Sequence, residues 1–146
     1  MDRIIGKEVT GLQNMLARHI ERMSVEAGKE RISGPNLFIL KFIKENSDKD
    51  IFQRDLEQVI ETTKSTCSKV ISTMEGKGLI RRVAVKDARY KKICLTPFGE
   101  EVIGIADKYM EDFENNIIQG LTQEQINNFF VCIDKIKSNL AKLKIE

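Results

Sequence analysis

The chain has 146 residues, of which 41% are hydrophobic and 32% charged, with 9 Gly and 2 Pro. This length suits one domain with a real core, and the composition excludes a disordered or collagen-like chain. No apolar run approaches the ~18 residues of a membrane span, and charge and glycine come too early for a signal peptide. We therefore expect a single domain over residues 1–146, cytoplasmic and without a membrane partner.

Positive charge is concentrated in one short segment of a nearly neutral chain. Residues 63–95 contain nine Lys or Arg and two acidic residues, a net +7, whereas the whole chain carries only +2. Such a cluster indicates an electrostatic footprint for nucleic acid. Taken alone, the cluster is explained about equally well as a solvated basic surface.

The residue types of metal sites and enzymes do not form a pattern. Cys67, Cys94 and Cys132 are far apart, and their odd count argues against a disulfide framework. The single histidine, His19, has no cysteine nearby, so we expect neither a metal site nor a cofactor. Without a glycine-rich phosphate loop, a nucleophile with a plausible histidine base or motif-placed carboxylates, we also expect no enzymatic activity.

Apolar spacing predicts two helices in the first third of the chain. Residues 3–25 place apolar groups three and four positions apart, which marks one face of a helix. Residues 25–34 read as a loop. Ser33 or Gly34 then caps a second helix, which Pro35 enters and residues 46–48 end.

Three short elements are predicted next. Ile51 and Phe52 indicate a short bridging strand, and a helix follows over residues 53–60. Thr63 is a good N-cap for the next helix, which Gly78 ends in a left-handed conformation. This helix places Cys67, Val70, Ile71 and Met74 on one side, and Lys64, Ser65, Ser68, Lys69 and Ser72 on the other.

A hairpin and two long helices complete the prediction. Residues 79–85 and 90–95 are β-prone runs around the charged turn 86–89. Thr96 and Pro97 then begin a long amphipathic helix. Thr122 and Gln125 form a capping box at the start of the last one.

The basic segment coincides with the second helix of a helix–turn–helix unit and with the hairpin. In such a unit the second helix enters the major groove, and its N-terminal side chains reach base edges. Short hydroxyls and lysine suit contacts with bases and phosphates. The helix residues expected to contact DNA are Thr63, Lys64, Ser65, Thr66, Ser68 and Lys69.

This segment resembles the multiple-antibiotic-resistance regulator (MarR) family of winged helix-turn-helix transcription factors. The resembling residues are KSTCSKVISTMEGKGLIRR (64–82) and DARYKKICLTPFG (87–99). They include Met74-Glu75, Gly78-Leu79, Arg82, Asp87, Arg89, Leu95-Thr96 and Gly99. Phe52 departs from the family pattern, which often has threonine there as a helix cap.

The resemblance implies a mainly α fold with a small β-hairpin wing (α+β). It implies a DNA-binding lobe at 34–97, with dimerisation helices at 1–25 and 98–146. Arg89 would sit at the wing tip and enter the minor groove, where a narrow A·T-rich duplex attracts arginine. Asp87 would steady its guanidinium, although from the spacing alone an exposed ion pair of little consequence is as good an explanation. The wing residues expected at DNA are Lys86, Asp87, Arg89 and Lys91.

These expectations combine into a dimeric repressor, relieved by an effector, that reads an inverted repeat in double-stranded DNA. The 63–77 helix would lie in the major groove and the 86–91 wing in the minor groove. The family resemblance allows a small, often phenolic effector near His19, Phe42 and Tyr109, although an apolar core explains these residues as well or better. The alternative is a winged-helix module that binds protein without specific DNA binding.

Overall fold

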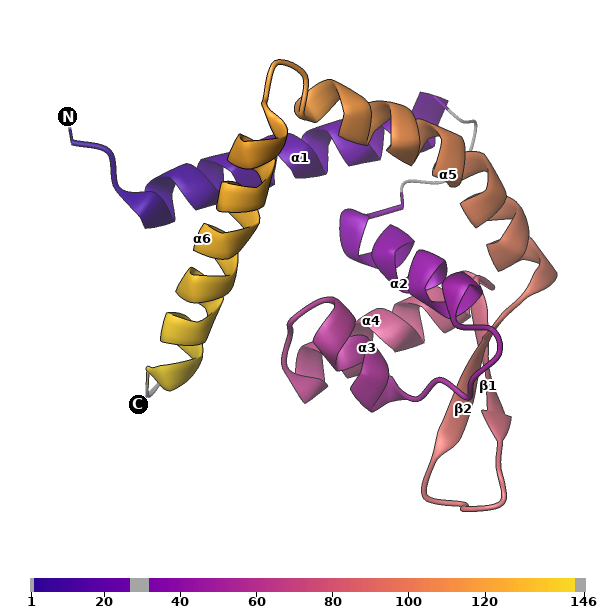
Figure 1. Cartoon of the computed structure of the whole chain (residues 1–146). Coiled ribbons are helices and arrows are strands. Elements are labelled where there is room, and N and C mark those ends of the chain that lie inside the picture. Colours follow the sequence, from indigo (N-terminus) through magenta and orange to yellow (C-terminus); the bar gives the residue numbers. More distant parts are fainter. Residues whose placement is uncertain (1, 27–31, 144–146) are drawn as a thin grey trace. The chain divides into compact units, whose positions relative to one another are not determined.

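The computed structural model describes residues 2–26 and 32–143 (Figure 1). The elements are α1 (Ile5–Glu26), α2 (Gly34–Glu45), α3 (Gln53–Val59), α4 (Lys64–Gly76), β1 (Ile80–Ala84), β2 (Lys91–Leu95), α5 (Pro97–Ile117) and α6 (Gln123–Lys142). This confirms the expected winged-helix order of helices around one hairpin. The predicted loop falls in part on residues 27–31, which lie outside the described residues.

The chain divides into two compact units, Met1–Tyr109 and Met110–Glu146. The first contains the helix–turn–helix, the hairpin and α1, and the second contains α6 with the end of α5. The grouping of residues 1–25 with residues 98–146 stays a prediction. No helix of the described residues is long and apolar enough to cross a membrane.

Side-chain caps fix where several helices begin, as the sequence predicts. Ser33 Oγ accepts a hydrogen bond from the Asn36 N–H at the start of α2, and Thr63 Oγ1 accepts one from the Thr66 N–H at the start of α4. Thr122 and Gln125 form the predicted reciprocal box at α6, with bonds of 3.2 and 2.9 Å. These bonds satisfy backbone donors that the first turn of a helix leaves unpaired.

Phe52 begins α3 without a side chain that can accept a hydrogen bond. Asp55 supplies half of a cap instead, because its Oδ2 accepts the Phe52 N–H at 2.8 Å. The same bond explains why the predicted strand at Ile51 and Phe52 is wrong. Ile51 O accepts one hydrogen bond from Ile93 N at 2.8 Å, and the Phe52 N–H is then already committed to Asp55, so no ladder continues.

The core of the first unit lies beneath the helix–turn–helix and the base of the hairpin. Each helix buries one side, as expected from the apolar spacing. The most deeply buried side chains are Ile39, Leu40, Leu56, Cys67, Ile71, Met74, Leu79, Ile80, Val102 and Ile103.

Two glycines are required where α4, the hairpin and α5 meet. Gly78 has a φ of +73°, which makes it the left-handed terminator predicted after α4. A Cβ on Gly99 would lie 2.1 Å from the carbonyl oxygen of Leu79. Thr96 reinforces this junction, because its hydroxyl is shared between the Gly78 and Leu79 carbonyls and accepts the Gly99 N–H at 2.9 Å. The start of α5 is therefore fixed to the base of the wing.

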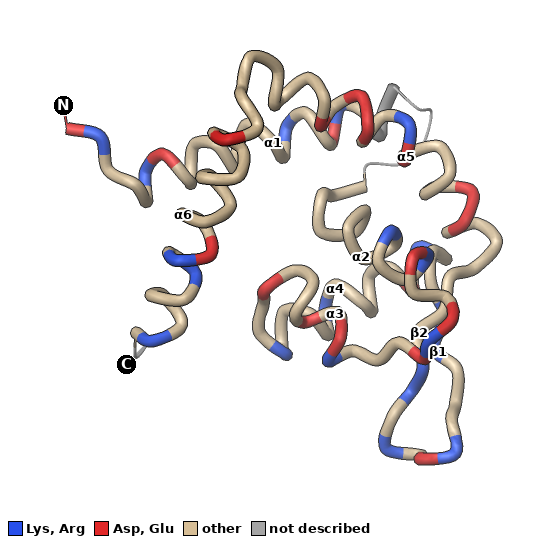
Figure 2. The backbone as a smooth tube through the Cα atoms, viewed as in Figure 1, with Lys and Arg blue, Asp and Glu red and all other residues tan. Residues whose placement is uncertain are grey.

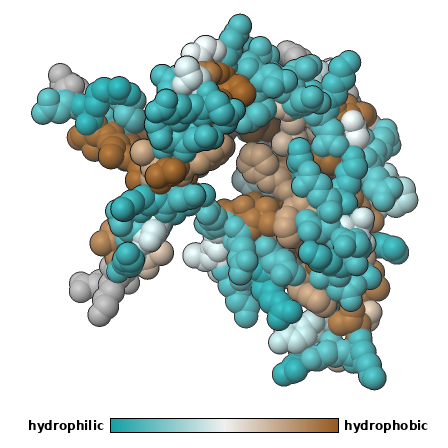
Figure 3. Space-filling model, in the orientation of Figure 1, coloured by the Kyte–Doolittle hydropathy of each residue, from teal (hydrophilic) through white to brown (hydrophobic). Residues whose placement is uncertain are grey.

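Apolar side chains remain exposed on α1 and α6, each considered within its own unit. On α1 and the residue before it these are Ile4, Ile5, Val9, Leu12 and Met15, and Figure 3 shows apolar surface along the N-terminal part of this helix. On α6 and its C-cap they are Phe129, Phe130, Val131, Leu140 and Leu143. No residue of α6 is buried.

Candidate nucleic-acid interface

Helix α4 presents one polar side to solvent and packs the opposite side into the core. Lys64, Ser65 and Lys69 are exposed, whereas Cys67 and Ile71 are buried. Ser68 is half-buried at the border between the two sides. The structure therefore places the predicted recognition residues at the surface of the first two turns.

The two threonines at the start of α4 are engaged with each other. Thr63 Oγ1 lies 3.0 Å from Thr66 Oγ1 and caps the helix through the Thr66 N–H. Gln53 at the start of α3 donates from Nε2 to the Lys64 carbonyl at 3.3 Å. The first turns of α3 and α4 are thus joined, and Lys64 projects from that junction.

The hairpin forms a short antiparallel pair with a charged tip. Its register pairs Ile80 with Leu95 and Ala84 with Lys91, and the Tyr90 N–H donates to the Asp87 carbonyl at 3.1 Å within the turn. Figure 2 shows lysine, arginine and acidic residues gathered at this tip. Near the start of β2, Lys92 pairs with Asp50 at 2.9 Å, which ties the hairpin to the residues before α3.

Asp87 holds Arg89 at the tip of the wing. Asp87 Oδ1 accepts hydrogen bonds from the backbone N–H and the Nε of Arg89, both at 3.1 Å, and Oδ2 accepts one from a terminal guanidinium nitrogen at 2.8 Å. The arginine side chain is 78% exposed. These bonds lower the pKa of Asp87 and raise that of Arg89, first through the side-chain hydrogen bonds. The Arg89 guanidinium is therefore charged, held in one orientation by Asp87 and exposed to solvent.

A second ion pair joins the end of α4 to the first strand of the wing. Arg82 Nε lies 3.5 Å from Glu75 Oε2, and the Arg82 guanidinium donates to Ser72 Oγ at 2.9 Å. Glu75 and Arg82 belong to the pattern on which the family resemblance rests. Their contact gives that spacing a physical role, since it fixes the wing relative to the recognition helix.

A groove of about 460 Å³ lies between the start of α3, the start of α4 and the wing. The acidic Glu57 also lines it. Its cationic residues are Arg54, Lys64, Arg82, Arg89 and Lys91. Five cations against one carboxylate make this groove suited to a polyanion.

Sequence reasoning missed three residues of this groove wall. Tyr90 lies edge-on to Phe52, with ring centroids 6.1 Å apart and an interplanar angle of 68°. The Arg54 guanidinium carbon lies 5.5 Å from the Phe52 centroid and 5.8 Å from that of Tyr90. Arg89 approaches the Tyr90 ring at 5.5 Å. The departure from the family pattern at Phe52 was the one signal in the sequence that could have pointed here.

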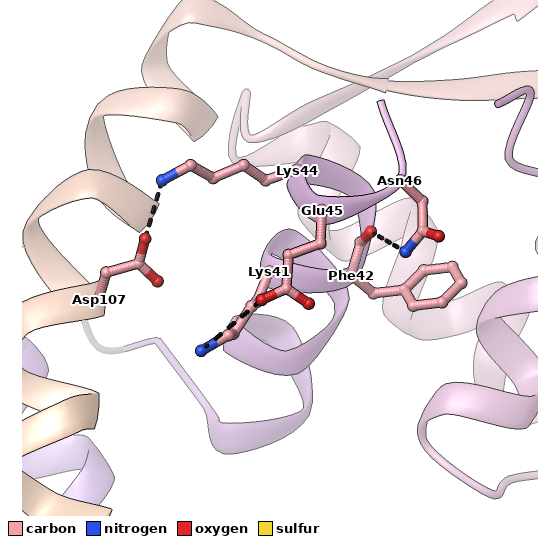
Figure 4. Close-up of polar contacts among 6 residues, drawn as sticks. All are labelled: Lys41, Phe42, Lys44, Glu45, Asn46 and Asp107. Carbon is pink, nitrogen blue, oxygen red and sulfur yellow. Dashed lines mark hydrogen bonds and ion pairs between the residues drawn. The ribbon is translucent and has the colours of Figure 1, made fainter. Parts of the chain in front are cut away.

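The three effector candidates, His19, Phe42 and Tyr109, do not line the cationic groove. His19 is exposed on α1, Phe42 is half-buried on α2 and Tyr109 is partly exposed on α5. The polar contacts near Phe42 are structural: Asn46 Nδ2 donates to the Phe42 carbonyl at 2.8 Å, and Lys44 pairs with Asp107 of α5 at 2.8 Å (Figure 4). Among the described residues, no group of three or more His, Cys, Asp or Glu side chains could hold a metal ion.

Residues 32–89, which include α2 to α4 and most of the wing, match the model of the MarR family. Over this winged-helix segment the chain is therefore similar to the MarR family. Solved structures of MarR-family proteins share the fold along nearly the whole chain. The heme sensor PefR from Streptococcus agalactiae, in complex with heme, is 25% identical, with 97% of each chain covered and a TM-score of 0.67.

Two further structures agree in fold. The MarR transcription regulator of Oenococcus oeni PSU-1 is 24% identical, with 96% of this chain and 100% of that chain covered and a TM-score of 0.75. S. aureus MepR, in complex with DNA, is 19% identical, with 95% and 99% covered and a TM-score of 0.82. These likenesses show that the chain has the winged-helix fold of these proteins, with the hairpin as its wing.

Proposed function

We propose that this chain is a transcriptional regulator of the MarR family that binds an inverted repeat in double-stranded DNA as a homodimer and acts as an effector-responsive repressor. One observation carries the DNA-binding part: Lys64, at the start of α4, and Arg89, at the wing, line the same cationic groove. In this proposal the 63–77 helix occupies the major groove and the 86–91 wing the adjacent minor groove.

The residues divide by the type of contact they can make. Lys64, Ser65, Ser68 and Lys69 are candidates for base edges, because they lie along the first two turns of α4. Thr63 and Thr66 set the start of the helix, because the Thr66 N–H donates to Thr63 Oγ1 and the two hydroxyls are hydrogen-bonded to each other. Lys86 and Lys91 flank the wing tip and suit phosphates, whereas Arg89, oriented by Asp87, suits the minor groove.

The apolar residues exposed on α1 and α6 support dimerisation. A single chain leaves large side chains such as Leu12, Phe129 and Leu140 about half exposed or more. Contiguous exposed apolar surface is typical of an interface, and a second copy of the chain offers the same helices in return. We infer that residues 1–25 and 98–146 form the dimerisation region, with residues 34–97 as the DNA-binding lobe.

An effector response is the regulatory part of the proposal. PefR, 25% identical, is a heme sensor, and this suggests hemin as the first effector to test. His19 is the only histidine of the chain, so His19→Ala removes every imidazole that could bind the iron. If hemin is an effector, it releases the operator from the wild type; if it leaves operator binding unchanged, the effector is of another class.

The test is selection of duplexes from a random library by the purified full chain, followed by affinity measurements at several salt concentrations. We expect enrichment of an inverted repeat with half-sites about one helical turn apart, and affinity that falls steeply with salt. Sedimentation at micromolar concentration should give the mass of a dimer. A protein-interaction module would enrich no duplex, and a monomeric full-length chain would contradict the dimer.

A further inference from the structure

The wing is attached to the start of α3 by an aromatic and cationic stack. Tyr90, just before β2, meets Phe52, just before α3, although the two residues are 38 positions apart in sequence. Two guanidiniums lie close to the Tyr90 ring, Arg54 at 5.8 Å and Arg89 at 5.5 Å. Such distances fall within the range of cation–π attraction, about 6 Å.

Arg54 differs from three other arginines of the described residues in how its charge is balanced. Arg3, Arg82 and Arg89 each pair with a carboxylate. Within the part of the chain that the structure describes, Arg54 makes no ion pair, and its guanidinium lies over the rings of Phe52 and Tyr90. An aromatic face restrains a guanidinium without neutralising it, and the N–H donors in its plane stay free for another acceptor.

The position of Arg54 identifies that acceptor. A duplex that takes α4 in its major groove and the wing in the adjacent minor groove must carry one sugar–phosphate strand between the two. The groove of about 460 Å³ lies in that place, and Arg54 lines it together with Lys64 and Lys91. Neither lysine forms an ion pair within the described residues.

We propose that Arg54 contacts a DNA phosphate and that Phe52 and Tyr90 are positioning residues that hold Arg54 and the wing in place before DNA arrives. This inference rests on the proposed DNA-binding function and assigns roles to three residues outside the recognition helix and the wing tip. Phe52 thus has a role that a capping threonine could not fill. A preordered arginine loses less conformational freedom on binding, so the stack contributes affinity without touching a base.

The phosphate-contacting residue and the positioning residues should affect the salt dependence of DNA binding differently. Arg54→Gln removes a charge, so we expect about tenfold or greater weakening on every duplex and a smaller salt slope, by about 0.9 for each phosphate that the variant no longer neutralises. Tyr90→Leu keeps all charges, so affinity should fall while the slope stays close to that of the wild type. Tyr90→Phe retains the ring and should bind as the wild type does.

Arg18→Gln is the matched control. It removes the same charge from an exposed position on α1, off the apolar stripe, and should change neither affinity nor slope. The double variant Arg54→Gln/Tyr90→Leu should lose less than the product of the two single losses, because Tyr90 acts in part through Arg54.

A measurement on the free protein tests the contacts of Tyr90 with the two arginines independently of DNA binding. In the free protein, the side-chain protons of Arg54 and Arg89 should show ring-current shifts in the NMR spectrum. Tyr90→Leu should remove those of Arg89 and reduce those of Arg54, which also lies over Phe52, whereas Tyr90→Phe should keep both. If the wild type bound no duplex, the proposed function would fail while these shifts still reported on the stack. If the wild type bound DNA and Arg54→Gln matched Arg18→Gln in affinity and slope, the phosphate role of Arg54 would be overturned. Wild-type affinity of Tyr90→Leu would overturn the positioning role.

Discussion

Asp87 accepts three hydrogen bonds from Arg89, one from its backbone N–H and two from its guanidinium, all within 3.1 Å. The pair lies two residues apart at an exposed hairpin tip, where an ion pair adds little to the free energy of folding. The pair matters because it sets the direction of the Arg89 guanidinium. The carboxylate orients a permanent charge at the farthest point of the wing, which is what entry into a narrow groove requires.

Asp87→Ala should therefore weaken operator binding less than loss of Arg89 does, because it frees the arginine and leaves its charge in place. Arg89 holds the pKa of Asp87 below its usual range. The carboxylate is ionised above that range, and the pair is lost only as the pH falls through the lowered pKa. Fluorescence anisotropy between about pH 5 and 8 should show no transition that Asp87→Ala removes. Such a transition would mean that Asp87 does not pair with Arg89 in solution.

The exposed residues of α4 should specify sequence, whereas the wing lysines should supply affinity. Lys64→Ala or Ser65→Ala should alter preference at particular base pairs, by about 1–3 kcal/mol for a good direct contact. Lys91→Ala should weaken all duplexes similarly, because phosphate contacts carry no base information. Selection from a random library with each variant distinguishes the two roles. An unchanged operator after Lys64 and Ser65 are exchanged would place the readout elsewhere.

Gly99→Ala should destabilise the domain, by about 1–3 kcal/mol or more, because the new Cβ would meet the Leu79 carbonyl oxygen at 2.1 Å. Gly104 provides a control on the same helix, since a Cβ there meets nothing within 4 Å. Gly104→Ala should stabilise α5 by about 0.5–1 kcal/mol. Urea unfolding of the two variants checks both signs. Equal stability of Gly99→Ala and the wild type would show that α5 does not approach the hairpin so closely.

Local signals in the sequence were sufficient for most of the fold. Caps such as Ser33 and Thr63 act within three residues, and helix stripes repeat within one turn, so both can be read without knowing the tertiary structure. The strand predicted at Ile51 and Phe52 is wrong because it depended on a hydrogen-bond partner that the sequence pattern does not show. Its continuation depended on whether the Phe52 N–H was free, and the Asp55 carboxylate had taken it.

The candidate site could be predicted only where it is local. The bonds between Asp87 and Arg89 span two residues, and the family pattern already implied them. The contact of Phe52 with Tyr90 and the approach of Arg54 to both rings depend on how the hairpin packs against α3. No periodicity or composition signal encodes such a contact, so Arg54 went unnoticed although the charge cluster begins only a few residues later.

The cysteines should be dispensable for regulation. Cys67 is fully buried, and burial, with a smaller effect of Glu57, raises the pKa of its thiol, so it stays protonated and unreactive at neutral pH. A thiol reagent should modify the exposed Cys132 first and Cys67 only on unfolding. Cys67→Ala/Cys94→Val/Cys132→Ala should keep operator binding that peroxide does not affect. Release of DNA by mild oxidation in the wild type but not in this variant would contradict this expectation.

The most direct test of the account is the affinity of Arg89→Ala for a selected operator at several salt concentrations, beside Arg89→Lys and the wild type. Because the proposed dimer has two wings, Arg89→Ala removes two positive charges from the complex. It should bind much more weakly, and its salt slope should be smaller by about 0.9 for each of the two lost contacts. Arg89→Lys should recover only part of the affinity, since an ammonium lacks the planar head that fits a narrow groove. Folding and dimerisation should be unchanged, because the Arg89 side chain is 78% exposed. Equal affinity of Arg89→Ala and the wild type would mean that the wing does not touch DNA, and would contradict the proposed mode of binding.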